Sequence, residues 1–410
     1  MLKEITLENF KALERVTMNP SRITVLIGPN GAGKSSLFQA LALLKQSREQ
    51  DAFITNGLYV RIGEFADFVT AGATRRRVSF RIGLDATMPS ALSPEMPTGS
   101  VLCTYQLEID NWGLVSHKTQ YDLPDQRSLR CAFDFKQKKG TISPEKLFPR
   151  VDLSPGGLVC VPLFVSSTDP HLYRAAKGLR DIILEYLENI FIIPTERAIN
   201  NPSYPQQSLP GAELLTPEQV ANFFVYKSEA RKQLSEWLSR LLGEDLELDF
   251  HLKKGESEIV IDVRRRESTN VRDEGSGLHH VLWPLAQLVA APSKSLVAIK
   301  EPEIHLHPRA QAQLSDVLVD VAVNDDKELM ITTQSEHMLM RFLTRVAEGK
   351  LATDDLAIYY FKKKEAGVVD AVKLHVDEEG RIEGGLKGFF EADVEELAKF
   401  IEALARKRSQ

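Results

Sequence analysis

The sequence lacks the features of a secreted, membrane-spanning or disulfide-stabilised protein. Its three cysteines, Cys103, Cys131 and Cys160, lie far apart with no CxxC pair, so neither a disulfide framework nor a zinc site is expected. The start, MLKEITLENF, is charged and has no apolar signal core. The longest apolar stretch, near Val281–Ala291, is interrupted by a proline and a glutamine and is far shorter than the roughly 18 residues of a membrane helix. We therefore expect a cytoplasmic protein with no membrane partner.

The chain also lacks a surplus of positive charge. Lys plus Arg number 51 against 57 Asp plus Glu, and the net charge is −6. Nucleic-acid-binding domains are usually basic, so nucleic acid is only weakly supported as a partner. Two triplets, Arg75–Arg77 and Arg264–Arg266, could hold a phosphate backbone, although a solvated surface that offsets nearby acids is the favoured interpretation. The 410 residues, 43% hydrophobic and 26% charged, fit an ordinary globular protein with one large domain and an insertion, or with two domains.

Three nearly continuous apolar runs have the length of buried strands. They are Ile23–Ile27, Ser295–Ile299 and Leu329–Thr332, and each ends in polar residues. The first leads into a glycine loop and then into apolar residues at helical spacing. Continuous runs of this kind are typical of parallel strands covered on both faces. The pattern predicts an α/β fold with a P-loop NTPase core and a mostly parallel central sheet.

The middle of the chain predicts an antiparallel β meander followed by a helical insertion. Strands are expected at Val78–Leu84, Ser100–Ile109, Leu114–Leu123 and Leu129–Phe135. Residues 140–170 are expected to be loop-rich. Two helices are then expected, at Ala175–Glu188 and Pro217–Leu242, with a short strand at Ile190–Ile193 between them. A hairpin formed by Leu246–Leu252 and Glu258–Val263 is expected to follow the second helix. We expect residues 1–138 to form the N-terminal part of the ATPase, 139–244 the insertion and 245–410 the C-terminal part.

The segment from Gly28 to Ser35, GPNGAGKS, satisfies the phosphate-loop pattern G-x-x-x-x-G-K-[ST] between a strand and a helix. Its glycines let the backbone wrap phosphates, and the amides and helix N-terminus supply positive potential. We expect Lys34 to reach the β- and γ-phosphates of ATP, and Ser35 to ligate Mg²⁺. The expected nucleotide-binding residues in this loop are Asn30, Gly31, Ala32, Gly33, Lys34, Ser35 and Ser36.

Two strand ends carry candidate catalytic groups. Lys300-Glu301-Pro302-Glu303 follows the second apolar run, and Glu301 is the expected base that orients the attacking water. Alternatively, Glu301 caps the following helix or lies on the surface. The third run is followed by Thr333 and Gln334, which could sense the γ-phosphate.

Two further clusters flank the carboxylate strand. His305 and His307 beside Glu303 leave a metal site open as a second interpretation. The turn Gly275-Ser276-Gly277 opens a helix-patterned segment and could bind an anion on its amides.

The order of these motifs resembles the RecF/SMC/OLD branch of ABC ATPases, including bacterial proteins grouped as "AAA family ATPase". The opening LKEITLENFKALERV with ITVLIGPNGAGKSS is similar to the first hairpin and Walker A of that branch. The segment DEGSG resembles a degenerate ABC signature loop, EPEIHLHPRAQ the Walker B and D-loop, and TTQSEHMLMRF the switch segment. The tail GGLKGFFEADVEELAKF is similar to a short C-terminal extension of one bacterial subgroup. The resemblance covers residues 1–70 and 245–410 well.

The resemblance implies a head-to-tail homodimer with two ATP molecules at its interface. Lys34 and Ser35 of one copy would bind ATP, and Ser276 and Gly277 of the other would close over the γ-phosphate. Residues 63–67 resemble the Q-loop region, without a clear counterpart of the glutamine.

Two residues depart from the family pattern. Lys300 stands where the family has an acid before the catalytic glutamate, and Gln334 stands where it usually has a histidine. Two unit charges 4 Å apart interact by roughly 4 kcal/mol at an effective dielectric constant of 20, so a cation here would oppose Mg²⁺ binding. Lys300 must point away, pair with Glu301 or Glu303, or replace part of the metal's charge against phosphate. Slow turnover is expected.

These observations predict an ATP-driven switch or clamp that closes as a dimer. The OLD resemblance implies DNA-linked work or phage defence with a separately encoded effector, because the residues after Lys350 are too few for the separate nuclease domain of OLD proteins. The alternative is a nucleotide-sensing scaffold that regulates a partner with little or no hydrolysis. The motor subunit of a membrane importer is disfavoured, since EPEIHLHP is foreign to that group.

Overall fold

The computed structural model describes the chain with a few gaps. The described residues are 1–50, 52–74, 76–87, 99–143, 153–154, 163–164, 170–193, 196–243, 245–364, 368–383 and 385. Cys160, Arg75, most of the expected loop-rich segment 140–170 and the C-terminal stretch after residue 385 lie outside them.

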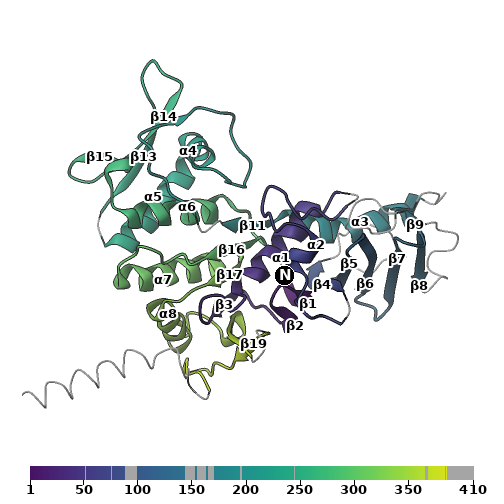
Figure 1. Ribbon diagram of the computed structural model, residues 1–410. Coiled ribbons are helices and arrows are strands. Elements are labelled where there is room, and N and C mark those ends of the chain that lie inside the picture. The colour runs from purple at the N-terminus through teal and green to yellow at the C-terminus, as the bar shows by residue number, and fades with distance from the viewer. Residues whose placement is uncertain are drawn as a thin grey trace, which may run out of the picture.

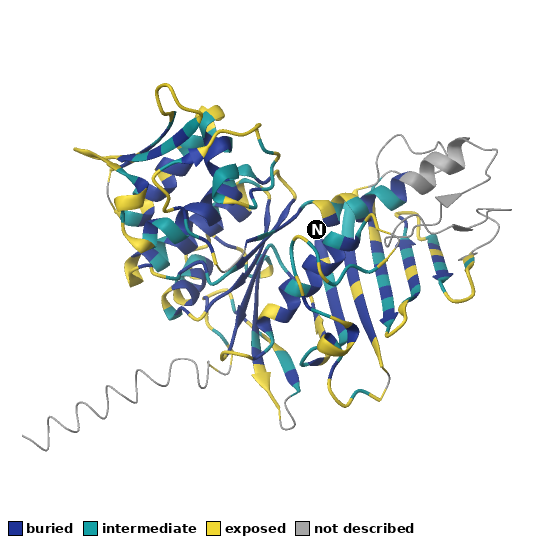
Figure 2. Cartoon of the chain, turned by 45° about the horizontal axis from the view of Figure 1, so that its top comes forward, coloured by how far each residue is buried: buried dark blue, intermediate teal, exposed yellow. Residues whose placement is uncertain are grey.

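A mostly parallel sheet forms the centre of the molecule. In spatial order its strands are β11 (Ile190–Ile193), β16 (Leu296–Lys300), β17 (Glu328–Thr332), β3 (Ile23–Ile27), β18 (Leu356–Lys363) and β19 (Val369–Leu374). All neighbours are parallel except β18 and β19. Every residue of β3 and β17 is buried, because both faces of the sheet are covered. Figure 2 shows these strands as a dark blue layer between helices on one side and a broad second sheet on the other.

The second sheet is antiparallel and contains the expected meander. Its order is β2 (Leu13–Met18), β1 (Leu2–Phe10), β4 (Arg77–Thr87), β5 (Ser100–Asp110), β6 (Gly113–Asp122), β7 (Ser128–Asp134) and β8 (Lys139–Ser143). Buried residues alternate with more exposed ones along β5 and β6, as in strands with one face toward a core. Helix α1 (Lys34–Ser47) shares one core cluster with this sheet and with one face of the parallel sheet (Figure 1).

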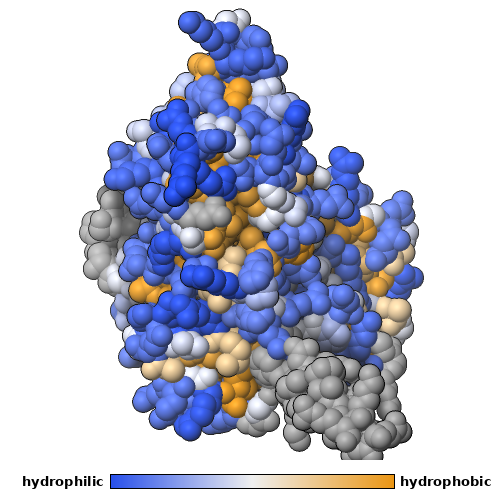
Figure 3. Space-filling model, turned by 90° about the vertical axis from the view of Figure 1, so that its left-hand side faces the viewer, coloured by the Kyte–Doolittle hydropathy of each residue, from blue (hydrophilic) through white to orange (hydrophobic). Residues whose placement is uncertain are grey.

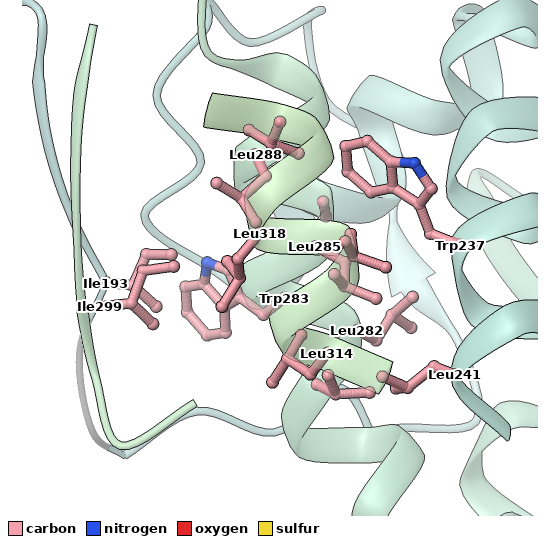
Figure 4. Packing of buried hydrophobic residues seen from close by; sticks show 14 of the residues in the cluster. Ile193, Trp237, Leu241, Leu282, Trp283, Leu285, Leu288, Ile299, Leu314 and Leu318 are labelled. Atoms are coloured by element: carbon pink, nitrogen blue, oxygen red, sulfur yellow. The ribbon is translucent and has the colours of Figure 1, made fainter. Parts of the chain in front are cut away.

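The opposite face of the parallel sheet is covered by three helices. They are α6 (Ser276–Ala290), α7 (Pro308–Asn324) and α8 (Glu336–Ala347). Trp237 and Trp283 are buried in this second core, and Figure 4 shows Trp283 between Leu318 and the strand residues Ile193 and Ile299.

A smaller lobe packs outside these helices. It contains α4 (Pro217–Tyr226), α5 (Ser228–Leu242) and a small sheet of β12 (Tyr204–Pro205), β13 (Glu247–Leu252), β14 (Glu258–Arg264) and β15 (Ser268–Asn270). Thr216 caps the first helix, since its side chain accepts a hydrogen bond from the Gln219 amide. The expected single helix Pro217–Leu242 is wrong: Lys227 leaves helical geometry at φ −120° and ψ 83°, after an aromatic and β-branched run of low helix propensity.

The remaining described elements are short, apart from one helix beside the antiparallel sheet. They are α2 (Phe65–Phe68), α3 (Pro170–Glu188), β9 (Leu153–Ser154), β10 (Leu163–Phe164) and the 3₁₀ turns Val271–Asp273 and Thr353–Asp355. The described helices include none that is long and apolar enough to cross a membrane.

The face that carries α7, α8 and the small lobe is largely hydrophilic, with apolar side chains in smaller groups (Figure 3). On this lobe the second basic triplet is largely engaged by acids. Arg264 pairs with Asp249 and Arg265 with Glu274, which supports the interpretation of a surface that offsets nearby acids. On β4, Arg77 lies 3.8 Å from Glu108.

Asp316 joins α7 to α8 through two arginines. Its carboxylate accepts hydrogen bonds from Arg341 (2.8 Å) and Arg345 (2.7 Å). Burial alone would raise the pKa of Asp316, but these bonds outweigh it and lower the pKa. The Asp316 side chain is 11% exposed, so the two guanidinium groups are fixed in a partly desolvated site.

We predict that Asp316→Asn lowers the free energy of unfolding by about 2–3 kcal/mol, because three charge-assisted hydrogen bonds from two arginines lose their anion. Asp320→Asn on the same helix is the control, since its pair with Arg240 is exposed and should contribute less than about 1 kcal/mol. Urea denaturation measures both. Equal losses in the two variants would contradict the role given to Asp316.

Candidate functional site

The carboxyl ends of three parallel strands meet at one edge of the central sheet. Lys300 of β16 pairs with Thr332 of β17, and Thr332 pairs with Leu26 of β3. The segments that follow these strands therefore start side by side, at the edge where open α/β sheets bind ligands. They contain Glu301, Gln334 and the phosphate-loop segment from Gly28 to Ser35, all expected from the sequence.

The phosphate loop passes very close to its neighbours. Gly28 has φ +134°, and a Cβ added there would lie 2.3 Å from the Phe361 carbonyl oxygen on β18, so only glycine fits. The loop ends at Gly33, which precedes the first residue of α1. Asn30, Gly31 and Ser35 are exposed, so amides and a hydroxyl face open space at a helix N-terminus.

Lys34 is folded back onto its own loop. Its Nζ donates hydrogen bonds to the carbonyl oxygens of Gly28 (2.6 Å) and Pro29 (3.0 Å), and the residue is buried. Burial lowers the pKa of Lys34, while the neighbouring Glu301 and Glu303 raise it in part. An ammonium group held by two carbonyls next to two carboxylates is a cation that an anionic ligand could draw out of the loop.

Gln334 connects the phosphate loop to the expected base. Its Nε2 donates to Asn30 Oδ1 (2.9 Å) and to Glu301 Oε1 (2.8 Å). The backbone amide of Glu301 in turn donates to the Thr332 carbonyl oxygen (2.8 Å). Three residues that the sequence proposed separately thus lie in one hydrogen-bonded group.

Glu303 connects the segment that follows β16 to the segment that follows β17. Its Oε1 accepts hydrogen bonds from the Thr333 hydroxyl (2.6 Å) and the Gln334 amide (2.9 Å). Burial raises the pKa of Glu303, and these two donors lower it in part. Its other oxygen has no hydrogen-bond partner among the described residues. Glu303 is therefore a structural anchor of the switch segment that starts at Thr333.

Arg197 is the functional candidate to which sequence reasoning assigned no role. The residue is 3% exposed, and its guanidinium donates to the carbonyl oxygens of Lys300 (2.9 Å), Glu301 (2.9 Å) and His280 (3.1 Å). Burial lowers its pKa to about 10. One side chain therefore joins the end of β16 to the first turn of α6. The available signal was an arginine shortly after the apolar strand Ile190–Ile193.

Lys300 points to the same side of the sheet as α1. Leu296 and Ala298, four and two residues before it, belong to the core cluster of α1, whereas Val297 and Ile299 belong to the opposite cluster. Burial lowers the pKa of Lys300, the nearby Lys11 lowers it further, and Glu301 raises it. Among the described residues no hydrogen bond or ion pair holds its ammonium group.

The Gly-Ser-Gly turn, Gly275–Gly277, lies at the start of α6. Ser276 is exposed, and a Cβ on Gly277 would lie 3.0 Å from the His305 carbonyl oxygen, so the turn packs directly on the segment after Glu301. The rings of His280 and His305 lie 4.5 Å apart. Within the described part of the chain, no hydrogen bond or ion pair joins Ser276 or Gly277 to residues 28–35. Among the described residues of one chain, the turn therefore makes no direct polar contact with the phosphate loop.

The site suits a triphosphate better than it suits a metal ion. Exposed loop amides, Lys34 and a helix N-terminus match phosphate oxygens. Mg²⁺ is usually held by one or two carboxylates together with phosphates. Here Ser35 offers a hydroxyl and Glu301 a carboxylate, but the strand-end position carries the Lys300 amine. The donor set is thus incomplete for Mg²⁺, and Mg²⁺ binding stays a prediction.

The second metal interpretation gains no support. The described residues contain no cluster of three or more His, Cys, Asp or Glu side chains arranged to hold a metal ion. His307 instead caps α7, since its ring accepts the Arg309 amide at 3.4 Å.

A cleft of about 810 Å³ lies elsewhere, lined by Met1, Tyr186 and Glu328 among others. Glu328 begins β17, so this cleft is at the amino edge of the parallel sheet. The phosphate loop, Glu301 and Gln334 lie at the carboxyl edge of the sheet, and we assign the candidate nucleotide site to that edge.

Comparisons with known proteins show which proteins this chain is similar to. The "AAA ATPase domain" family model matches residues 1–78 and 216–339, just under half of the chain. A second model, "Protein of unknown function (DUF3696)", matches residues 351–400. An "OLD nuclease" of Thermus scotoductus is 21% identical over 413 positions, which cover 93% of this chain and 68% of the relative.

Solved structures share the fold. A crystal structure of an SmcHead bound to the C-winged helix domain of ScpA has a TM-score of 0.52 at 13% identity, covering 92% of this chain and 98% of that chain. An Smc head domain from Pyrococcus furiosus, with an extended coiled coil and bound to the C-terminal domain of ScpA, has a TM-score of 0.46 at 12% identity, covering 98% and 99%. At these identities the first similarity concerns the fold alone, and the second is too low to add to it.

The phosphate loop, the strand order around it and the sequence matches point the same way. They support the resemblance of this chain to the RecF/SMC/OLD branch of ABC-type P-loop ATPases.

Proposed function

We propose that this ATP-binding chain is a switch that closes as a head-to-tail homodimer around two ATP molecules. The observation that carries the proposal is that the exposed Gly-Ser-Gly turn makes no hydrogen bond or ion pair with the phosphate loop among the described residues of one chain. Lys34 instead donates to its own loop, and Ser276 is exposed and free to meet another chain. A second copy would supply the turn that completes each site.

In this proposal each residue has a defined task. The amides of residues 30–36 bind the phosphates, and Lys34 leaves the carbonyls of Gly28 and Pro29 to reach the β- and γ-phosphates. Glu301 orients the attacking water, and Gln334 reports the γ-phosphate because it contacts both Asn30 and Glu301. Ser276 and Gly277 of the partner close the site. The division into residues 1–138, 139–244 and 245–410 is proposed to separate ATPase parts from a partner-specific insertion.

We further propose that hydrolysis is slow. The Gln334 amide donates to the Glu301 carboxylate and so competes with water for it, and Lys300 adds a cation at the strand end. The same observations favour the second candidate function, a nucleotide-sensing scaffold with little or no hydrolysis. A variant that lacks the Glu301 carboxylate separates the two functions, because it should trap an ATP-bound dimer only if the unchanged protein hydrolyses ATP.

The biological setting follows only from similarity to an OLD nuclease. We propose DNA-linked work or phage defence in which a separately encoded effector responds to the closed dimer. Purification of the tagged chain with and without ATP, followed by identification of bound proteins and nucleic acid, tests this. If neither a protein nor nucleic acid is recovered, the proposed biological setting is wrong, while the proposed ATP-driven switch is unaffected.

We predict that Glu301→Gln accumulates an ATP-bound dimer, because binding persists while water is no longer activated. The dimer fraction measured by size-exclusion chromatography with light scattering should rise severalfold over the unchanged protein. Lys34→Ala should stay monomeric at the same ATP concentration. If Glu301→Gln and the unchanged protein dimerise equally, the scaffold without hydrolysis is the correct function.

We predict that two inactive variants complement each other in a mixture. Lys34→Ala removes ATP binding, and Ser276→Arg blocks closure, so each homodimer should be inactive. A mixed dimer pairs the intact loop of one chain with the intact turn of the other and regains one complete site. ATP turnover in an equimolar mixture should therefore exceed the mean of the separate variants. No gain on mixing would mean that each site is complete within one chain.

We predict that Arg197→Met weakens closure and turnover more than ATP binding. It leaves three carbonyls without their donor, and these belong to the Glu301 strand end and the α6 turn, not to the phosphate loop. ATP affinity should change less than about threefold, while single-turnover hydrolysis falls roughly tenfold or more. Arg197→Lys, which keeps a donor and a charge, should recover part of the rate. Parallel losses of affinity and melting temperature would indicate a purely structural role.

A further inference from the structure

Two ammonium groups lie together beside the nucleotide edge of the sheet. Lys300 ends β16 on the α1 side, and Lys11 of the β1–β2 turn reaches α1, where its Nζ donates to Gln39 Oε1 (2.7 Å). The two charges are close enough that Lys11 lowers the pKa of Lys300. Neither lysine forms an ion pair with any described residue. Two neighbouring cations without a paired carboxylate are unfavourable unless an anion joins them.

The triphosphate of the proposed ATP site would lie on this side of the sheet, at the N-terminus of α1. α1 begins at Lys34 and Ser35, so its N-terminus, Lys34 and the Lys300 ammonium all belong to one face of the sheet. The Gln39 contact fixes Lys11 on the second turn of the same helix. Glu301 raises the pKa of Lys300, but it accepts a hydrogen bond from Gln334 and forms no ion pair with Lys300. Among the described residues the Lys300 ammonium therefore has no ion-pair partner.

We infer that Lys300 provides the counter-charge that a metal ion would otherwise supply, and that this site takes metal-free ATP. This inference rests on the proposed ATP site and adds the ionic form of its ligand. A lysine ammonium is a compact point charge with three donors and binds phosphate oxygens well. A divalent ion close to it would be repelled. Metal-free ATP keeps its full negative charge, and Lys300 with Lys34 offsets part of it.

The test is the affinity of the full chain for ATP in excess EDTA and in excess Mg²⁺, measured by calorimetry. For the unchanged protein the two affinities should agree within about threefold, because Lys300 replaces the metal charge. Lys300→Asp should bind roughly tenfold or more weakly in EDTA and recover in Mg²⁺, since an acid now repels phosphate and attracts the ion. Lys300→Met, which removes the charge without adding an acid, should lose affinity in EDTA to a smaller degree.

Controls separate this inference from the proposed function. Lys232→Asp makes the same charge change at an exposed position of α5 and should behave like the unchanged protein. An unchanged protein that binds ATP in Mg²⁺ but loses more than about tenfold in EDTA would overturn the inference and leave the ATP site standing. Absence of binding in both conditions, or equal binding by Lys34→Ala, would overturn the proposed function and this inference together. A Lys300→Asp protein that binds ATP with the same affinity in EDTA and in Mg²⁺ would also overturn the inference.

Discussion

The parallel register of β16, β17 and β3 is the constraint on which the site depends. Lys300, Thr332 and Leu26 are paired across the three strands, so the segments that follow must leave the sheet at the same edge. Hydrogen bonds then connect these segments: Glu301 to the Thr332 backbone, and Gln334 to Asn30 and Glu301. A shift of one residue in any pairing would turn the side chain of Lys300 to the other face and break these contacts. The core clusters on the two faces hold the register, because each strand residue is buried against a fixed set of helices or strands.

The charges at this edge are arranged around an anion. Lys34 and Lys300 are partly desolvated, and the loop amides and the N-terminus of α1 add positive potential. The two nearby carboxylates are occupied, Glu301 by Gln334 and Glu303 by Thr333 and the Gln334 amide. Both contacts run through the segment that starts at Thr333, so in the proposed switch an anion that draws Gln334 away would move this segment and α8 behind it. Arg197 provides the second link, from the Glu301 strand end to His280 of α6, the helix that begins at the Gly-Ser-Gly turn.

Much of this edge could be predicted from local sequence, because strand, glycine loop and helix are local patterns. The phosphate loop, the strand that ends before Glu301 and the strand that ends before Gln334 follow from apolar runs and their polar ends. The contact of Gln334 with Asn30 follows only from the strand order, which no local pattern states, since the two residues are 304 positions apart. Arg197 could not be assigned for the same reason: its partners are backbone carbonyls of residues 83 to 104 positions away. The helix break at Lys227 was missed because hydrophobic periodicity continues across it, while backbone geometry does not.

The central claim is that the Gly-Ser-Gly turn of one chain seals the phosphate loop of another. Cysteines placed beside the two groups test it without altering either motif. Lys363 lies with its Nζ next to Gly31, and Asp273 is exposed just before the turn, while the described native cysteines are buried. Chains carrying Lys363→Cys are mixed with chains carrying Asp273→Cys and treated with a short bis-maleimide. The account predicts a cross-linked pair of chains that forms with ATP and not without it. Cross-linking absent from the mixture, but present within a single chain that carries both cysteines, would contradict it.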